Sequence, residues 1–138
     1  MKLSARIASA LLLASTTLVM ASVSPSAPQP DVSDVMSKVL QDYPGKSVSV
    51  LAVKYPPGAV EPMHRHDAHA FVYVLEGSIV MAVEGGEETT LLPGQVFYEG
   101  PADLHTVGRN ASQTEPAKFV VFLLKKADAP VFLPADRP

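Results

Sequence analysis

The stretch GAVEPMHRHDAHAFVYVLEG, residues 58–77, decides both the fold and the chemistry expected of this chain. It begins and ends with glycine and holds three of the four histidines, His64, His66 and His69. Alternate residues of a β-strand point to the same face, so His64 and His66 project two imidazoles into one space while Arg65 points away. Imidazole is mostly neutral at pH 7, and its free ring nitrogen binds zinc, copper, iron or nickel. Two such side chains form half of a metal site.

The sequence on both sides of this stretch has the rhythm of an all-β protein. Short runs rich in Val, Phe and Tyr alternate with Pro and Gly from residue 47 onward, which predicts a sandwich or barrel. The turn Glu84-Gly85-Gly86-Glu87 predicts a hairpin, because glycine readily adopts positive φ. The predicted strands are residues 47–54, 61–66, 70–75, 78–83, 89–92, 96–98, 105–109 and 118–125.

Two segments resemble the sequence motifs of the cupin family, and the resemblance covers about residues 48–125. The first runs from Gly58 over five residues to His64-Arg65-His66, then over three residues to Ala70 and over six more to Gly77. The second runs from Gly94 over five residues to Gly100-Pro101-Ala102, then over two residues to His105. The resemblance implies a jelly-roll (double-stranded β-helix) barrel in which His64, His66 and His105 converge on a divalent metal ion.

The chain departs from the family pattern at the fourth ligand, a glutamate in cupins, because the register that keeps Gly77 places Ala70 there. His69 precedes that slot and would complete a four-imidazole site if the backbone rotates. Strand parity opposes this, since residues 69 and 70 face opposite ways, and the alternative places His69 at the pocket rim or behind the ligands. In the second motif Gly100 and Ala102 replace the family's proline and glycine, while His105 keeps its place.

The missing carboxylate has an electrostatic consequence. Three neutral imidazoles leave the +2 charge of the ion uncompensated, so the site should attract a small anionic ligand. Nickel, copper and zinc suit such a site better than manganese, and iron(II) stays compatible, so the sequence leaves all five metals open. The acidic residues that flank the motifs are interpreted as acceptors for imidazole N–H groups or as solvated charges; they are Glu61, Asp67, Glu99 and Asp103.

The alternative to a metal site is a barrel that has lost its metal and keeps the histidines as ordinary polar side chains. Clustered imidazoles without a cation would repel each other when protonated, which favours the metal site.

The N-terminus is predicted to be a secretory signal peptide, residues 1–21. Lys2 and Arg6 precede an apolar run over residues 7–20, and Val19-Met20-Ala21 suits cleavage after Ala21. The alternative is an uncleaved anchor, for which the run is short compared with the ~20 apolar residues of a membrane span. We therefore expect a periplasmic or secreted protein that is not held at a membrane after cleavage.

Domain organisation follows from composition. Residues 22–33 are rich in Ser and Pro and are predicted to be an extended tether. Residues 34–138 form the predicted cupin domain, with a barrel core over about residues 47–126. A short helix is predicted at its start, because Val35, Met36, Val39 and Leu40 fall on one helical face before Pro44-Gly45.

Composition and charge limit the partners. The chain has 11 Lys+Arg, 14 Asp+Glu and a net charge of -3, so it lacks the basic surface that nucleic-acid binding requires. The absence of cysteine excludes disulfides, thiolate catalysis and Cys-ligated zinc. Phe71, Tyr73 and Leu75 should face away from the pocket, and so apolar a face is expected to be covered by the helix and by a second copy in a homodimer.

Two classes of function stay open. The first is an enzyme whose metal ion promotes oxygenation, isomerisation or decarboxylation of a small carboxylate, enolate or phenolic compound. The second is a module that binds or senses a small ligand without converting it. Consumption of a substrate or of dioxygen would identify the enzyme, whereas stabilisation by ligand alone would identify the binder.

Overall fold

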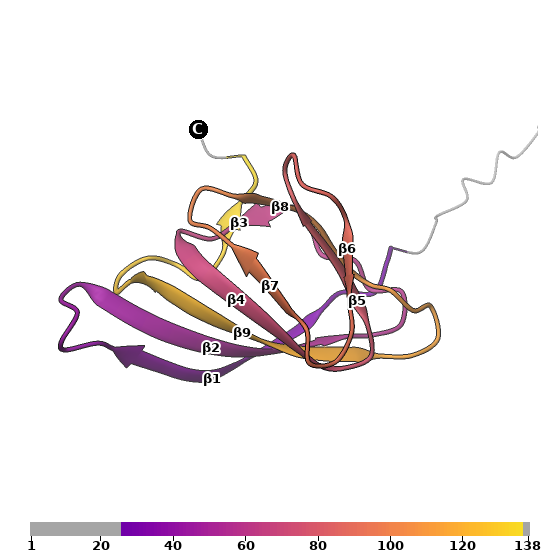
Figure 1. Ribbon diagram of the computed structural model, residues 1–138, viewed down its shortest axis with the longest axis horizontal. Helices are drawn as coiled ribbons and strands as arrows, with labels where there is room; N and C mark the ends of the chain where they lie inside the picture. Colours follow the sequence, from indigo (N-terminus) through magenta and orange to yellow (C-terminus); the bar gives the residue numbers. More distant parts are fainter. Residues whose placement is uncertain (1–25, 137–138) are drawn as a thin grey trace, which may run out of the picture.

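The computed structural model describes residues 26–136, which form two facing antiparallel five-stranded sheets with no helix in that range (Figure 1). The predicted all-β jelly-roll fold is therefore confirmed. The strand order is β1-β2-β9-β4-β7 in the first sheet and β10-β3-β8-β5-β6 in the second. The strands are β1 (Asp31–Val39), β2 (Lys46–Tyr55), β3 (His64–Arg65), β4 (Ala68–Glu76), β5 (Ile79–Val83), β6 (Thr89–Leu91), β7 (Val96–Glu99), β8 (Leu104–Asn110), β9 (Ala117–Lys126) and β10 (Leu133–Pro134).

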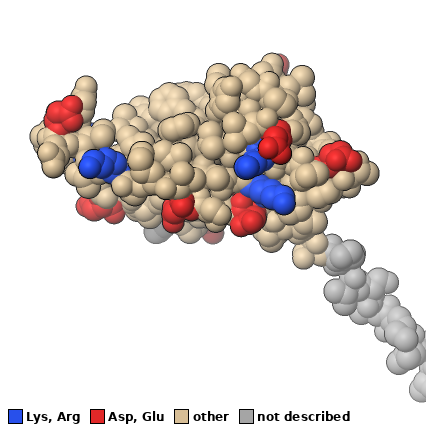
Figure 2. Space-filling model, turned by 90° about the horizontal axis from the view of Figure 1, so that it is seen from below, with Lys and Arg blue, Asp and Glu red and all other residues tan. Residues whose placement is uncertain are grey.

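Each of the eight strands predicted from residue 47 onward corresponds to one strand of the structure, β2 to β9. Their side chains alternate as a half-buried sheet requires. In β4, Val72 and Val74 are buried between the sheets, while Phe71, Tyr73 and Leu75 are 40–48% exposed on the outer side, as parity predicts. This outer face of the first sheet has an uncharged middle, with charged groups nearer its two ends (Figure 2).

The predicted N-terminal helix is wrong: residues 31–39 form strand β1 instead. β1 pairs antiparallel with β2 from Asp31↔Lys54 to Val39↔Ser47, with one irregularity between Asp34 and Met36. All nine of its side chains are exposed, so this segment buries no apolar helix face and is held by backbone hydrogen bonds to the sheet edge. The spacing of its apolar residues fits a helix, but the free edge of β2 offers a partner that local periodicity cannot reveal.

The predicted tether, residues 22–33, overlaps β1 by three residues, because β1 begins at Asp31; residues 26–30 have no regular secondary structure. The predicted signal peptide, residues 1–21, lies outside the described residues. Within residues 26–136, no helix of the length and apolarity needed to span a membrane occurs.

Two strand pairings position the functional side chains. β3 pairs with β8 so that His64 lies opposite His105 in the second sheet. β4 pairs with β7 so that Ala70 lies opposite Glu99 in the first sheet. His64, Glu99 and His105 thus point into the same interior, although His64 lies far from the other two in the sequence.

Candidate metal centre

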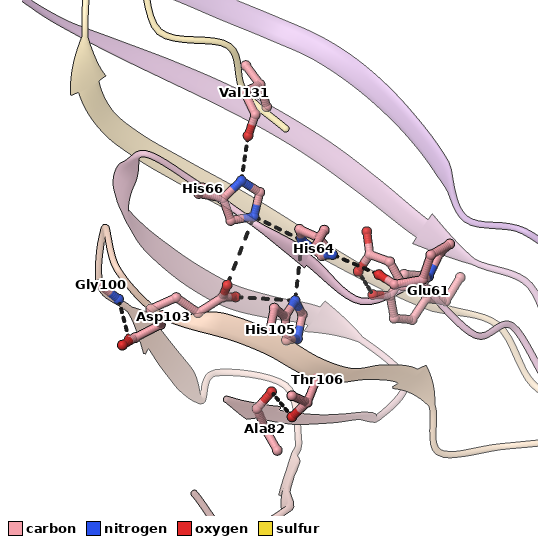
Figure 3. Close-up of polar contacts among 12 residues, drawn as sticks. Glu61, His64, His66, Ala82, Gly100, Asp103, His105, Thr106 and Val131 are labelled. Carbon is pink, nitrogen blue, oxygen red and sulfur yellow. Dashed lines mark hydrogen bonds and ion pairs between the residues drawn. The ribbon is translucent and has the colours of Figure 1, made fainter. Parts of the chain in front are cut away.

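Three imidazoles meet between the sheets (Figure 3). His64 Nε2 lies 3.1 Å from His66 Nε2 and 3.4 Å from His105 Nδ1. The three residues are only 2–8% exposed. The structure therefore brings together the three histidines that the cupin resemblance implies as ligands.

Backbone carbonyls fix the tautomers of His64 and His66. The Nδ1 of His64 lies 2.9 Å from the carbonyl oxygen of Pro62, and the Nδ1 of His66 lies next to that of Val131. A carbonyl only accepts hydrogen bonds, so each Nδ1 carries the hydrogen and each neutral ring keeps an unprotonated Nε2. In the 3.1 Å contact between these Nε2 atoms, two lone pairs therefore face each other. Two acceptors this close need a cation between them.

Burial keeps these three imidazoles neutral. Burial lowers the pKa of His64 and of His66, and burial together with the neighbouring His64 lowers the pKa of His105 to about 4. Two nitrogens bound at about 2.0–2.1 Å to one ion, at roughly 90–109°, lie about 2.9–3.4 Å apart. The observed separations of 3.1 and 3.4 Å fall in that interval. The donor set fits a divalent metal ion of the kind that imidazole prefers.

Glu99 also faces this cluster. Its Oε1 lies 3.7 Å from His105 Nδ1 and its Oε2 lies 3.9 Å from His66 Nε2, and its side chain is 5% exposed. Burial, with Glu61 and Asp103 adding to it, raises the pKa of Glu99 to about 8. Burial thus opposes charge on both sides of these contacts, because it raises the pKa of the carboxyl group and lowers the pKa of the imidazoles. Ligand atoms of His64, His66 and Glu99 lie within 4.8 Å of one another, close enough to hold one ion.

Glu61 is the second acidic side chain in the interior. Its Oε2 accepts a 2.6 Å hydrogen bond from the Tyr55 hydroxyl. Gly108 leaves room for this pair, because a Cβ there would lie 2.9 Å from Glu61 Oε2 and 3.1 Å from the Tyr55 hydroxyl oxygen. Glu61, His64 and His105 form a second group whose ligand atoms lie within 4.8 Å of one another.

The sequence interpretation of Glu61 and Glu99 was incomplete. It treated them as acceptors or solvated charges, whereas the structure places both inside the barrel. A signal was present for Glu99, because residues 97 and 99 share a strand face opposite to residues 96 and 98. That parity becomes informative only once the pairing of β7 with β4 is known.

The structure does not bring His69 to the cluster, which corrects the four-imidazole alternative. His69 is exposed on the outer face of the first sheet, and its Nδ1 lies 2.8 Å from the Tyr98 hydroxyl oxygen. Its ring stacks on the Tyr98 ring at an interplanar angle of 24°. The reason is strand parity: β4 is regular through this point, and Ala70 takes the interior position with no exposure.

A cavity of about 250 Å³ adjoins the three imidazoles and the two carboxyl groups. We call it the central cavity. Its walls are mostly apolar, so the few polar groups at its inner end would fix the orientation of a bound molecule. The apolar residues that line it are Val32, Leu51, Val53, Val72, Met81, Phe119, Val121, Val131 and Phe132.

The Tyr55 hydroxyl is predicted to control the proton affinity of Glu61. Burial is the largest influence and raises the pKa of Glu61, whereas the hydrogen bond from Tyr55 lowers it. Tyr55→Phe should therefore raise the pKa of Glu61 further and destabilise the fold by about 1–3 kcal/mol, the usual cost of an unpaired buried polar group. Carboxyl ¹³C NMR across a pH titration measures the first effect, and chemical denaturation measures the second.

Tyr98→Phe is the matched control for Tyr55→Phe, since it removes a tyrosine hydroxyl that bonds His69 on the exposed face. It should change stability by less than about 0.5 kcal/mol and leave Glu61 unaffected. An unchanged or lowered pKa of Glu61 in Tyr55→Phe would contradict the assigned role of the hydroxyl.

Together the two sheets and the interior cluster define a small double-sheet β-barrel with a histidine and carboxylate site of metal-binding type. The cupin domain family, Cupin_2, matches residues 51–123, more than half of the chain, and the protein belongs to that family. No match is found among curated proteins.

Solved structures agree with this fold at low sequence identity. An uncharacterised double-stranded β-helix protein from Klebsiella pneumoniae is 22% identical, with a TM-score of 0.61 over 83% of this chain and 91% of that one. The DMSP lyase DddQ from Ruegeria pomeroyi DSS-3 is 21% identical, with a TM-score of 0.56 over 63% of this chain and 42% of the lyase. An oxalate oxidase in complex with glycolate is 20% identical, with a TM-score of 0.58 over 74% and 53% of the two chains. The present chain thus spans about half or less of the two enzymes.

Proposed function

We propose that this protein is a metal-dependent cupin that binds a divalent ion through His64, His66 and His105 and acts on a small anionic compound. The observation that carries the proposal is the convergence of three neutral imidazoles, with ring nitrogens 3.1 and 3.4 Å apart. Carbonyl groups orient two of these rings from behind, as the ligands of a metal centre require.

The central cavity supports a small substrate. Its volume of about 250 Å³ admits a molecule of a few heavy atoms beside the imidazoles. A bound ion would supply Lewis-acid polarisation of a carboxylate, enolate or phenolic oxygen. The apolar walls would exclude water, and Glu61, held by Tyr55, would accept or return a proton at its carboxyl group.

The similar solved structures support an enzymatic function by analogy only. One is a DMSP lyase and another is an oxalate oxidase with glycolate bound, and both names refer to small charged or carboxylate compounds. Oxygenation, isomerisation and decarboxylation are the reaction classes proposed for this chain. Because one fold hosts many chemistries, the neighbours do not choose between them.

The alternative function is capture or sensing of a small ligand. The predominance of apolar residues in the central cavity favours it, because few groups other than the Tyr55–Glu61 pair offer proton transfer there. Such a module would be stabilised by its ligand without converting it.

Elemental analysis of protein purified without chelators tests the metal proposal, and one equivalent of a transition metal per chain is expected. The metal-loaded protein would then be incubated with small carboxylates and phenols while dioxygen and product are followed. Turnover that disappears on metal removal supports the enzyme, and thermal stabilisation without turnover supports the binder. Absence of metal from the purified protein and failure to take up added ions would contradict both.

We propose a periplasmic or secreted location on the basis of the predicted signal peptide. Fusion of residues 1–33 to a reporter should yield export and processing after Ala21. Recovery of the reporter in membranes with an intact N-terminus would favour the anchor instead.

We propose a homodimer formed through the outer face of the first sheet. Pairing aligns Met36, Val50, Phe122, Phe71 and Tyr98 in one row across all five strands. Four rings on this face, those of Phe71, Tyr73, Tyr98 and Phe122, are 42–50% exposed. They present roughly 300–400 Å² of aromatic surface, since a ring buries about 150–250 Å² when covered.

This aromatic area supplies most of the apolar surface that a second copy needs. A stable interface buries about 800 Å² per partner, of which roughly 450 Å² is apolar. Light scattering should report a dimer at tens of micromolar, and Phe122→Glu should convert it to a monomer. Leu92→Glu, at a residue 54% exposed outside this face, serves as the control and should stay dimeric. A monomeric wild-type protein would overturn the dimer proposal.

A further inference from the structure

We infer that Glu99 is the carboxylate ligand of the metal centre, so that the acidic ligand stands on β7 opposite the interior alanine of β4. The inference rests on the proposed metal site and names its fourth donor. It begins from the pairing of β4 and β7, which sets Ala70 directly across from Glu99.

Glu99 is oriented towards the imidazoles. Its two oxygens lie 3.7 Å from His105 Nδ1 and 3.9 Å from His66 Nε2, and its ligand atom groups with that of His64. Both distances exceed a normal hydrogen bond, so these contacts do not satisfy the carboxyl group. A cation among the four side chains would give it the partner that a buried carboxylate requires.

The neighbouring acidic groups are already engaged. Glu61 accepts the hydrogen bond from Tyr55, and Asp103 accepts a 2.7 Å hydrogen bond from the Gly100 amide. The carboxyl group of Glu61 lies within 4.8 Å of ligand atoms of only two histidines, His64 and His105, in its candidate group. Glu99 faces all three histidines. Glu99 is therefore the carboxylate best placed to complete the ligand set.

Ala70 makes this arrangement sterically possible. It is fully buried and contributes only a methyl group on the face from which Glu99 projects. Side chains directly opposite each other on paired strands have Cβ atoms about 4.5–5.5 Å apart, so a glutamate on either strand reaches nearly the same space. A glutamate at position 70 would compete with Glu99 for that space, so one long carboxylate at a time fits the pair.

The charge of the site changes accordingly. Three neutral imidazoles and one carboxylate lower the net charge of a divalent site from +2 to +1. The oxygen ligand makes iron(II) and manganese more favourable than an all-imidazole site would, while the remaining positive charge still attracts a small anion.

A cross-strand exchange tests the inference, with Zn²⁺ and Mn²⁺ as the titrated ions. Glu99→Ala should weaken Mn²⁺ affinity at least 10–100-fold, the range seen when groups that support a metal site are lost. The double variant Ala70→Glu/Glu99→Ala should recover most of that loss. Glu99→Gln keeps the size of the side chain, and it should bind as weakly as Glu99→Ala if the carboxylate is a ligand. Calorimetry gives the affinities, and the visible spectrum of Co²⁺-loaded protein reports the change of ligand.

Glu76→Gln is the matched control, because it neutralises an exposed carboxyl group at the end of β4, outside the central cavity. It should keep metal affinity within about 3-fold of wild type, on the expectation that side chains outside the ligand set have small effects. Wild-type affinity and an unshifted Co²⁺ spectrum in both Glu99 variants would overturn the inference while leaving the three-histidine site intact. A wild-type protein that takes up no ion would instead remove the proposed function on which the inference rests.

Discussion

Replacing both His64 and His66 with alanine is expected to abolish stoichiometric binding of divalent ions while the β-barrel stays folded. The two Nε2 atoms lie 3.1 Å apart and form the centre of the donor set. Loss of both should weaken affinity on the order of 1000-fold or more, because each lost interaction at a metal site costs at least about 10–100-fold. Elemental analysis and calorimetry measure the loss, and far-ultraviolet circular dichroism verifies the fold.

His69→Ala is the control for the double histidine variant. Its imidazole lies on the outer face against Tyr98, so its removal should leave metal affinity within about 2–3-fold of wild type, as for other surface substitutions. A fully occupied site in the double variant would show that the ion, if any, is held elsewhere. A large loss in His69→Ala would show that the outer histidine joins the site in solution.

Gly77→Ala is expected to be among the most destabilising single substitutions in the barrel. Gly77 has φ of +70°, and a Cβ there would lie 2.5 Å from the Pro116 carbonyl oxygen and 2.8 Å from the Ala117 Cα. These obstacles are backbone atoms, so they cannot rotate away as a side chain would. Strain and overlap together should cost about 3–5 kcal/mol and lower Tm by roughly 10–20 °C.

Gly94→Ala isolates the steric part of this effect. Gly94 also has positive φ, +87°, but a Cβ there meets no atom within 4 Å. It should therefore cost only the conformational penalty, about 1–2 kcal/mol. Equal Tm values for the two variants would show that the backbone near Pro116 yields to the added methyl group.

Strand parity explains why the sequence predicted the inner and outer faces of the strands and the pair His64 and His66, whereas His105 followed from the cupin resemblance. His64 and His66 stand two residues apart in a strand-like run, and alternation of Val72 and Val74 with Phe71 and Tyr73 distinguishes the inner face from the outer. The same parity argued against His69 as a ligand, and the structure places it outside. These features depend on residues close in sequence, which is why local pattern was sufficient.

Features that depend on strand pairing could not be predicted from the sequence. The run from Val35 to Leu40 fits a helix, and only the unpaired edge of β2 decides that most of it becomes β1. Glu99 looks like a loop charge until β7 is known to lie beside β4 with Ala70 opposite. The pairing of Ala70 with Glu99 joins residues 29 positions apart, and a single sequence carries no local signal of the register of either pairing.

The C-terminal arm, residues 131–134, gives the site a weakness that the barrel itself does not share. Val131 supplies the carbonyl that orients His66, and the Phe132 ring stacks on His64 with centroids 4.4 Å apart. The arm follows a mostly exposed connection over residues 127–130, where a protease finds accessible backbone. One cut there would free the His66 imidazole to rotate and uncover that of His64, which Pro62 still holds, while strands β2 to β9 kept their pairing. Proteolytic cleavage near the end of the chain would thus weaken the metal centre while leaving a folded protein of nearly normal mass.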